Sequence, residues 1–356
     1  MPVPPEIAAS DAAAASLNES SDRTPGVLKL RDGASYTGGL RALRLHGEGE
    51  VKWSDGGRYV GTFVDGGMHG RGTFYWGGDM AGQVYEGEWA ANRMQGQGQL
   101  LLRNGATFTG EWKRGRANGQ GTHVSKGDTY RGAFRDGARH GLGKLSLSSG
   151  DFYEGEFAQG KMEGQGVFVW KADESRFTGS WKGGMMDGQG EFLWGGARTG
   201  QAFSGLFEAG SMKTGVLRGV GGDVYEGEFE ADVYHGRGKL HSVTGSVYEG
   251  EFKNGLPHGE GAKTLANGDI YVGTFCQGAC DGSGTLTVQG LLPLRVMSRG
   301  GIIAIEPDCK PTAANVDCAS MLQTAPPVAP FSAFPSTADA ARNKQVLQTE
   351  TKFNIH

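Results

Sequence analysis

Residues 248–261 read YEGEFKNGLPHGEG, a sequence that contains a complete β-hairpin pattern. Alternation in its first half puts two aromatic rings and the glycine between them on one face, and two glutamates on the other. Asn254-Gly255 is a strong signal for a two-residue hairpin turn. A second alternating strand follows through Gly259 and Gly261. The stretch therefore predicts two antiparallel strands that share one aromatic face.

The pattern aromatic-x-Gly-x-aromatic recurs along most of the chain, in steps of 22 to 26 residues. Gly-x-Gly follows eleven residues after ten of the eleven starts, and the copy at Phe203 reads MKTGVLRG instead. Seven residues after the start, eight copies carry Gly, while Leu43, Asn92 and Asp232 take this place in the others. Such self-similarity is the signature of a repeat architecture. The starts are Tyr36 (a degenerate copy), Tyr59, Tyr85, Phe108, Tyr130, Tyr153, Phe177, Phe203, Tyr225, Tyr248 and Tyr271.

Composition narrows the fold class further. Gly contributes 64 of 356 residues, and each interior Gly costs about 1 kcal/mol in a helix, which rules out a helix bundle. The net charge is −4, whereas a general nucleic-acid binder is expected to be basic. No apolar run approaches the roughly 18–20 residues of a membrane span, and the first residues do not resemble a signal peptide. With only four Cys, we expect a soluble protein of a reducing compartment.

The Tyr-Glu-Gly-Glu-Phe…His-Gly-x-Gly pattern resembles the MORN repeat (membrane occupation and recognition nexus). The resemblance covers roughly residues 27–290, over 70% of the chain. It implies an all-β fold, an elongated, twisted antiparallel β-hairpin solenoid of about eleven MORN repeats, with aromatic side chains lining a long groove. The family occurs in radial-spoke heads of cilia, in protist cytoskeletal scaffolds, in junctional membrane tethers, and beside lipid-kinase or methyltransferase domains.

The array is predicted to span residues 27–290. Residues 1–26 are rich in Ala, Ser and Pro without periodicity, which predicts a disordered N-terminal segment. Residues 291–306, LLPLRVMSRGGIIAIE, predict one further apolar hairpin that caps the exposed end of the array. Residues 307–356 are rich in Pro and Ala and are predicted to be a tail that adopts structure only on a partner.

Five histidines recur at one repeat position, which raises the question of a metal site. Each repeat adds two strands of about 4.8 Å, so equivalent residues lie about 10 Å apart. Zn–N bonds are about 2.0 Å long, so neighbouring copies cannot share an ion. We therefore interpret the histidines as packing against turns. They are His46, His69, His140, His235 and His258.

Other candidate chemistry has a structural interpretation as well. Glu86 and Glu88 share a face about 7 Å apart, but the same pair recurs in four repeats and is typical of a solvated face. The Gly-x-Gly strings lack the continuation of a phosphate-binding loop. Cys276 and Cys280 have no supporting His for zinc, and the same holds for the pair Cys309 and Cys318. We expect no enzyme, no catalytic residue, no metal and no cofactor.

The functional expectation is a non-catalytic scaffold of a microtubule-based or cortical assembly, in the cytoplasm and cytoskeleton, above all in a cilium or flagellum. Its partners would be other proteins of that assembly and not nucleic acid. Two alternatives remain open: a membrane tether that binds anionic lipid, which the charge does not support, and a regulatory subunit of a separate enzyme. Pairing into a homodimer also remains open. The contact surfaces are expected to be the C-terminal tail and the groove, whose candidate residues are Tyr85, Trp89, Trp112, Phe134, Tyr153, Phe157, Trp181, Tyr225, Phe229, Tyr248 and Phe252.

Two long steps supply a second candidate contact. The segments 76–85 and 194–203 both begin Trp-Gly-Gly and continue to Gly-Gln before the next repeat, and they lie five repeats apart. One interpretation is the duplication of a five-repeat block. The other is a pair of partner-binding loops, since loops on a rigid scaffold often carry function. The residues at their tips are Asp79, Met80, Ala197 and Arg198.

Overall fold

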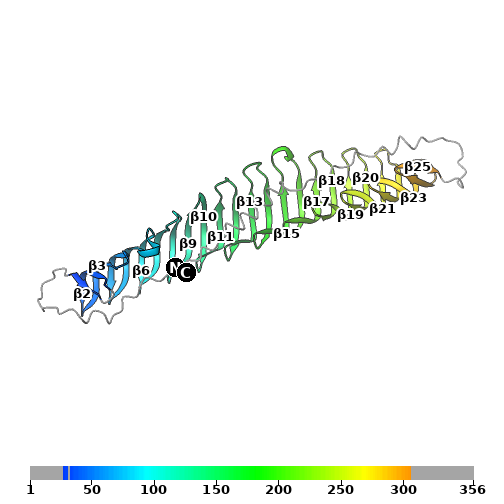
Figure 1. Cartoon of the computed structure of the whole chain (residues 1–356). Helices are drawn as coiled ribbons and strands as arrows, with labels where there is room; N and C mark the ends of the chain where they lie inside the picture. The colour runs from blue at the N-terminus through cyan, green and yellow to red at the C-terminus, as the bar shows by residue number, and fades with distance from the viewer. Residues whose placement is uncertain (1–26, 31–32, 306–356) are drawn as a thin grey trace. The chain divides into compact units, whose positions relative to one another are not determined.

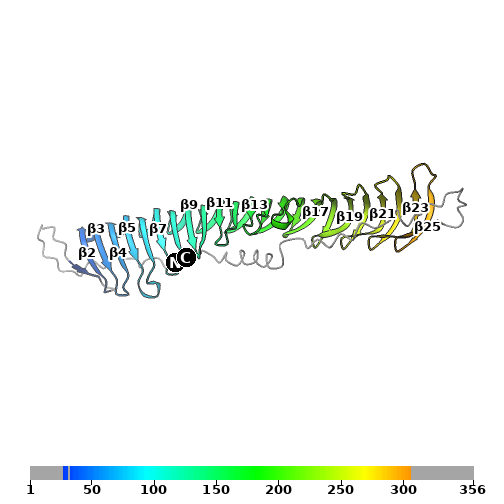
Figure 2. The ribbon, with the colours of Figure 1, turned by 90° about the horizontal axis from the view of Figure 1, so that it is seen from above.

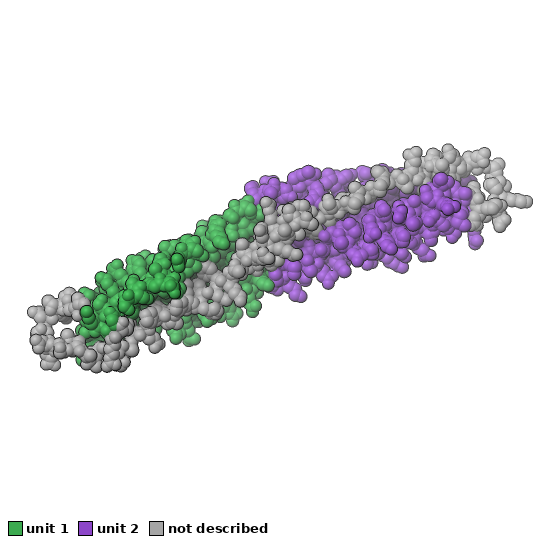
Figure 3. Space-filling model, in the orientation of Figure 1, with its two compact units in different colours: residues 1–162, 350–356 green, residues 163–349 purple. Residues whose placement is uncertain are grey.

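The computed structural model describes residues 27–30 and 33–305, which divide into two compact units. Figure 3 colours these units separately: the described residues up to Met162 belong to unit 1, and those from Glu163 onward belong to unit 2. The N-terminal segment 1–26 and the tail 307–356 predicted from the sequence lie outside the described residues. Within the described part there is no α-helix, and no helix is long and apolar enough to cross a membrane.

Unit 1 is built from antiparallel strands that follow one another in chain order (Figure 1). Strands that follow one another in the chain pair antiparallel; β5, for example, pairs with β4 and with β6. The strands are β1 (Val27–Lys29), β2 (Ser35–Arg41), β3 (Arg44–Lys52), β4 (Arg58–Val64), β5 (Gly67–Tyr75), β6 (Val84–Ala90), β7 (Arg93–Leu101), β8 (Thr107–Lys113), β9 (Arg116–Ser125), β10 (Asp128–Arg135), β11 (Ala138–Ser146) and β12 (Phe152–Ala158), with the 3-10 helix η2 (Gly78–Met80) between β5 and β6.

Unit 2 repeats the arrangement, as the view from above also shows (Figure 2). Its strands are β13 (Lys161–Val169), which begins at the last residues of unit 1, β14 (Arg176–Lys182), β15 (Met185–Leu193), β16 (Ala202–Glu208), β17 (Ser211–Arg218), β18 (Val224–Glu230), β19 (Val233–His241), β20 (Val247–Lys253), β21 (Leu256–Thr264), β22 (Ile270–Cys276), β23 (Ala279–Thr287), β24 (Leu294–Arg299) and β25 (Ile302–Ile305), with η3 (Gly196–Arg198) between β15 and β16.

The turn inside each repeat adopts the conformation that the sequence predicts. Asp136 and Gly137 have φ angles of 51° and 87°, the pair of positive values that a type I′ turn requires. Asn92 and Asp232 replace the usual Gly and have φ angles of 64° and 62°, which their short polar side chains tolerate. Leu43 also has a positive φ, of 60°, although it has no such side chain. The turn therefore keeps its positive φ angles in these three repeats although Gly is replaced, so the paired strands on either side also determine its geometry.

The core of both units is the aromatic face of the hairpins. The aromatic residue that opens a repeat pairs across the strands with a large side chain of the second strand: Tyr59 lies opposite Phe74, and Phe74 in turn lies opposite Tyr85. All three are at most 2% exposed. The alternate positions, such as Glu86, point to solvent. This confirms the predicted alternation of one aromatic face and one polar face.

At the far end of the described residues, β24 and β25 form a hairpin around Gly300 and Gly301, and β24 pairs with β23. Val296 on β24 is fully buried, whereas Ile302 on β25 is 70% exposed. The hairpin thus extends the sheet of unit 2. Its role as a cap of the array remains a prediction.

Candidate functional site

The aromatic rings of unit 1 form a continuous ladder. Tyr85 contacts Trp89 of its own repeat edge-on, with ring centroids 5.1 Å apart, and also Trp112 of the next repeat, at 5.2 Å. The alternation continues from Trp112 to Phe108 and from Phe108 to Phe134. Edge-to-face pairs at these distances are the favoured aromatic geometry and add about 0.5–1.5 kcal/mol each beyond burial. The ladder therefore joins successive hairpins as firmly as it joins the strands within one.

Unit 2 contains the same ladder. Tyr225 contacts Phe229 of its repeat at 5.1 Å and Phe252 of the next at 5.0 Å, both edge-on. Tyr248 contacts Phe252 and then Phe275 at 5.0 and 4.8 Å. Tyr234 departs from this pattern, because it stacks on Tyr225 with an interplanar angle of 12°.

All eleven aromatic residues predicted to line a groove lie in this ladder and are buried. Their exposed fractions are between 0 and 6%. The indole N–H groups of Trp89 and Trp112 also donate to backbone carbonyls of the preceding hairpin, those of Gly72 and Gly98. These side chains thus hold neighbouring hairpins together. Their direct contact with a partner remains a prediction.

A pair of glycines beneath each ring makes the ladder fit. Gly87 and Gly98 lie opposite each other on β6 and β7, and the ring of Tyr85 covers both. A Cβ added to Gly98 would lie 2.2 Å from Tyr85 Oη, which donates a hydrogen bond to the carbonyl of Glu88. Burial is also the main cause that raises the pKa of the Tyr85 phenol. The sequence predicts that Gly makes room for rings of neighbouring strands, and the structure shows that the ring is also the repeat's own.

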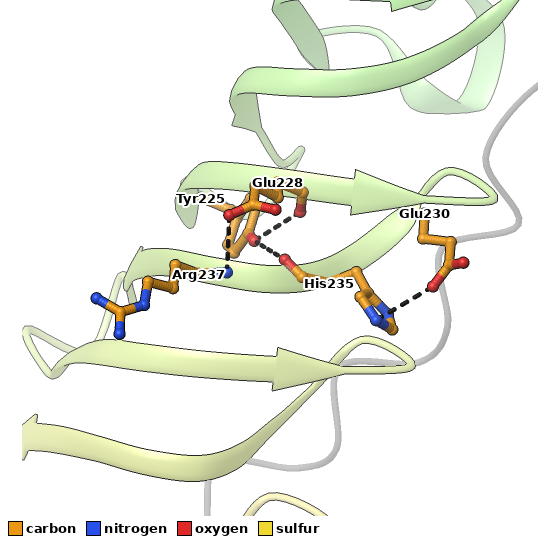
Figure 4. Close-up of polar contacts among 5 residues, drawn as sticks. All are labelled: Tyr225, Glu228, Glu230, His235 and Arg237. Atoms are coloured by element: carbon orange, nitrogen blue, oxygen red, sulfur yellow. Dashed lines mark hydrogen bonds and ion pairs between the residues drawn. The ribbon is translucent and has the colours of Figure 1, made fainter.

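The glutamates of the polar face have a structural role. The carboxylate of Glu228 accepts a hydrogen bond, 3.2 Å long, from the backbone N–H of Arg237, which lies in the bulge of β19 (Figure 4). Glu88 accepts from the backbone N–H of Gln97 in the same way, at 3.0 Å. Its neighbour Glu86 is exposed. The two glutamates of a repeat therefore occupy different environments, one bonded to backbone and one solvated.

The repeated histidines lie beside turns. His235 Nε2 lies 3.1 Å from Glu230 Oε2 (Figure 4), and His46 Nδ1 lies 3.8 Å from Asp65 Oδ1. Each of these contacts joins one His to one carboxylate. In the described part of the chain, no group of three or more His, Cys, Asp and Glu side chains is placed to hold a metal ion.

Backbone hydrogen bonds join the turns of successive repeats into one edge in each unit. The N–H of Gly115 donates to the carbonyl of Met94 in the preceding repeat, at 2.9 Å, and Gly137 donates to Ala117 in the same way. Asn92 makes this bond to Met68 and adds a second, because its Oδ1 accepts from the Met68 N–H at 2.7 Å. We call this the turn edge, defined as the row of turns inside the repeats, at residues 42–43, 65–66 and equivalent positions.

The turn edge of unit 1 carries a cavity that the sequence analysis did not find. Its volume is about 720 Å³, and its charged lining is formed by Arg93, Lys113, Arg114, Arg116, Arg135 and Asp136, with His140 alongside. The sequence showed only three cations in one turn. Arg93 and Arg135 lie about twenty residues away on either side, and the sheet brings them together because they occupy the turns of the adjacent repeats.

The two long loops fold alike. In each loop, a 3-10 helix follows Trp-Gly. A backbone hydrogen bond closes each loop: the main-chain N–H of Trp76 donates to the Gln83 carbonyl, and that of Trp194 donates to the Gln201 carbonyl. The tips differ in charge and exposure. Asp79 and Ala197 are exposed, whereas Met80 and Arg198 are half-buried, and the Arg198 guanidinium lies over the Trp194 ring. The shared loop structure fits both a duplication and a paired contact.

The segments that match a known protein family coincide with the repeats seen in the structure. The model of the MORN repeat matches nine segments that together span more than half of the chain: residues 36–58, 59–78, 85–107, 108–128, 130–152, 153–172, 177–196, 225–247 and 248–270. The chain belongs to the MORN repeat family. This confirms the resemblance found in the sequence, and it indicates a repeat protein of the interaction or scaffold type.

The MORN model passes over the copies that start at Phe203 and Tyr271, which the structure folds as hairpins of the same kind. In the Phe203 copy, Gly205 still lies opposite Gly215. The bulge between this pair and the turn is one residue shorter than in the other copies, and the absent residue is the first Gly of Gly-x-Gly. The missing Gly-x-Gly is therefore a shortened bulge in an otherwise complete hairpin, and about eleven MORN-like hairpins are present as predicted.

Other comparisons give only weak similarity. None of the curated proteins compared with the chain matches it significantly. Among solved structures, the TCP domain of SAS-4 (dCPAP) of Drosophila melanogaster, in complex with a proline-rich motif of Ana2 (dSTIL), is 12% identical, with a TM-score of 0.20, and covers 56% of this chain and 88% of its own. The wild-type TCP10 domain of Danio rerio CPAP is 10% identical, also at 0.20, and covers 70% and 94%. Similarities at this level carry no conclusion.

Proposed function

We propose that this MORN protein is a non-catalytic scaffold that binds other proteins in a microtubule-based or cortical assembly, in the first place a cilium or flagellum. The observation that supports this role is the coupling of each hairpin to its neighbours. Aromatic contacts, indole hydrogen bonds and turn-edge hydrogen bonds all join one repeat to the next within a unit. Such a sheet keeps surface side chains in fixed positions over many repeats, which suits a part that orients partners.

The polar face supports the same proposal. The outward positions of successive repeats present exposed polar side chains in register, such as Glu86 and Thr109, on strands that do not depend on them for packing. A partner that binds along this face would meet equivalent positions about 10 Å apart. The long loops add local features to an otherwise uniform surface.

Extraction of cells with detergent tests this proposal. A tagged full-length chain expressed in ciliated cells is expected to stay with the insoluble cytoskeletal or axonemal fraction and to be released only by high salt. For comparison, a variant whose aromatic ladder is broken by Phe134→Ala together with Tyr130→Ala should lose this retention. Complete release of the intact chain by detergent alone would contradict the proposal.

A further inference from the structure

The turn edge of unit 1 concentrates positive charge. Between residues 93 and 140 the sequence has nine Lys and Arg but only three Asp and Glu, in a chain whose net charge is −4. Five of these cations line the cavity of about 720 Å³, and Asp136 is the one carboxylate among its lining residues. We call this cavity the basic cleft, defined by Arg93, Lys113, Arg114, Arg116 and Arg135.

The cations of the basic cleft have no carboxylate partner within the part of the chain that the structure describes. All five side chains are exposed, and none takes part in an ion pair there. The cavity on the polar face of unit 2 differs, because there Lys239 Nζ lies 2.9 Å from Glu249 Oε2 and further glutamates line the same space. The positive charge of the basic cleft is thus uncompensated, whereas in the second cavity the glutamates outnumber the cations.

The charge pattern belongs to particular repeat positions. Lys113 and Arg116 lie opposite each other on the two sides of a turn, and Arg93 and Arg135 occupy the corresponding positions of the neighbouring repeats. In unit 2 these positions include Glu208 on β16 and Glu230 on β18. The fold therefore accepts either charge here, and packing does not require the cations of unit 1.

The backbone beneath the basic cleft is fixed. Arg114 has a φ of 51°, an uncommon value for a residue other than Gly, Asn or Asp. Its N–H donates to Gln95 Oε1 at 3.1 Å, and the N–H of Gly115 donates to the Met94 carbonyl at 2.9 Å. The three cation-bearing turns are thus held by bonds to the preceding repeats, so that little backbone conformational freedom is lost when a ligand binds.

We propose that the basic cleft binds an acidic segment of a partner protein, rich in Asp or Glu and extended in conformation. The three turns are separated by two strands each, about 10 Å, and an extended chain covers this distance in about three residues. A segment with carboxylates at such intervals can pair with each turn in succession. A single small anion would neutralise only one turn and leave the other cations uncompensated.

A protein segment fits these observations better than a membrane surface. The cations line a concave cavity on one edge, whereas a flat bilayer would meet the protruding turns and leave the lining unoccupied. The inference rests on the proposed scaffold role only in that the ligand is a protein.

Peptide binding in vitro tests the inference separately from extraction in cells. The probe is a fluorescein-labelled peptide of twelve Glu, with a Gln peptide as its control, measured by fluorescence anisotropy with the full-length chain at 50 and 300 mM NaCl. The cleft variant carries Arg93→Gln, Arg116→Gln and Arg135→Gln. The matched variant carries Lys182→Gln, Arg218→Gln and Lys253→Gln, three exposed cations of unit 2. Circular dichroism should show that both variants keep the fold.

The Glu peptide is expected to bind the intact chain at low salt, more weakly at high salt, and about tenfold more weakly to the cleft variant, because charged contacts at close range carry such binding. The matched variant should stay within about twofold. Equal weakening by both variants, or no binding of the Glu peptide, would overturn the inference. Cleft-dependent sedimentation with vesicles of phosphatidylcholine and phosphatidylserine, without peptide binding, would assign the basic cleft to membranes instead.

Discussion

The phenol oxygen of Tyr85 lies 2.2 Å from the place where a Cβ on Gly98 would stand. No side chain larger than hydrogen fits there unless the ring moves, and the ring is held by Trp89 and Trp112 on its two sides. The glycine pair and the aromatic ladder thus depend on each other, and the abundance of Gly in the chain is a packing requirement as well as a turn requirement.

We therefore expect Gly98→Ala to destabilise the protein by about 1–3 kcal/mol through overpacking, in urea unfolding followed by tryptophan fluorescence. Gly221→Ala is the control, because no atom lies within 4 Å of its added Cβ and its φ is not in the left-handed range. It should leave stability unchanged or raise it slightly. Equal effects of the two substitutions would show that the close approach of the ring does not matter.

The aromatic ladder makes a second prediction, for Phe134→Ala. This ring contacts Phe108 and Tyr130, at 4.9 and 5.1 Å, so its removal leaves a cavity between two repeats and should cost about 3–5 kcal/mol. Leu142→Ala on the same hairpin is the control, since Leu142 is 72% exposed and should change stability by less than about 0.5 kcal/mol.

Hydrogen exchange of the Phe134→Ala protein should show faster opening of β8 to β11 than of the more distant strands, because each repeat contacts only its neighbours. Uniform acceleration across all described strands would contradict this local response.

Asp232 gives a prediction about pH. Burial raises the pKa of its carboxyl group from 3.8 to about 6, although its oxygen accepts a hydrogen bond from the Met212 N–H. The folded state therefore binds a proton more tightly than the unfolded state, so this group lowers stability as the pH rises from about 4 to 6. Asp232→Asn keeps the acceptor, as Asn92 does in an earlier repeat, and removes the charge.

The Asp232→Asn protein should be more stable than the parent by about 1 kcal/mol at pH 7.5, a value discounted for solvent screening. The difference should shrink toward zero at pH 4, where the parent carboxyl is protonated when folded. Thermal unfolding at a series of pH values measures this. A difference that does not change with pH would mean that the charge of Asp232 is not the cause.

The long loops provide the fourth prediction. Shortening both loops, by removing residues 78–80 and 196–198, should leave the circular dichroism spectrum almost unchanged, because the buried strands on either side keep their pairing. It should reduce the recovery of partners in a pull-down from the cells of origin, more than either single deletion does. Undiminished recovery from the double deletion would leave duplication as the sufficient explanation of the loops.

Much of the fold could be predicted from the sequence because its determinants are local and repeated. The alternation around Gly250 and the positive φ at turns such as Asn254-Gly255 are short-range features, and eleven copies average out the exceptions. The shortened bulge at Phe203 was visible only as a missing motif, since pairing, not sequence, shows that Gly205 still faces Gly215.

The basic cleft could not be predicted in the same way. Its cations are spread over more than forty residues, and in the sequence only Lys113, Arg114 and Arg116 form a group. Their convergence with Arg93 depends on which edge of the sheet each side chain occupies. A tally of charge by repeat position, and not by window along the chain, is the signal that would have found it.

The turn-edge hydrogen bonds have an evolutionary consequence. Because they join the backbone of one repeat to the backbone of the previous one, as Gly137 is joined to Ala117, they make little demand on side-chain identity. A gene duplication or deletion of one whole repeat would leave every remaining bond of this kind intact. In unit 1, a repeat inserted between η2 and the basic cleft would increase their separation by a fixed increment of about 10 Å. The distance between two docking features can therefore evolve in steps of one repeat, while the residues of each feature stay unchanged.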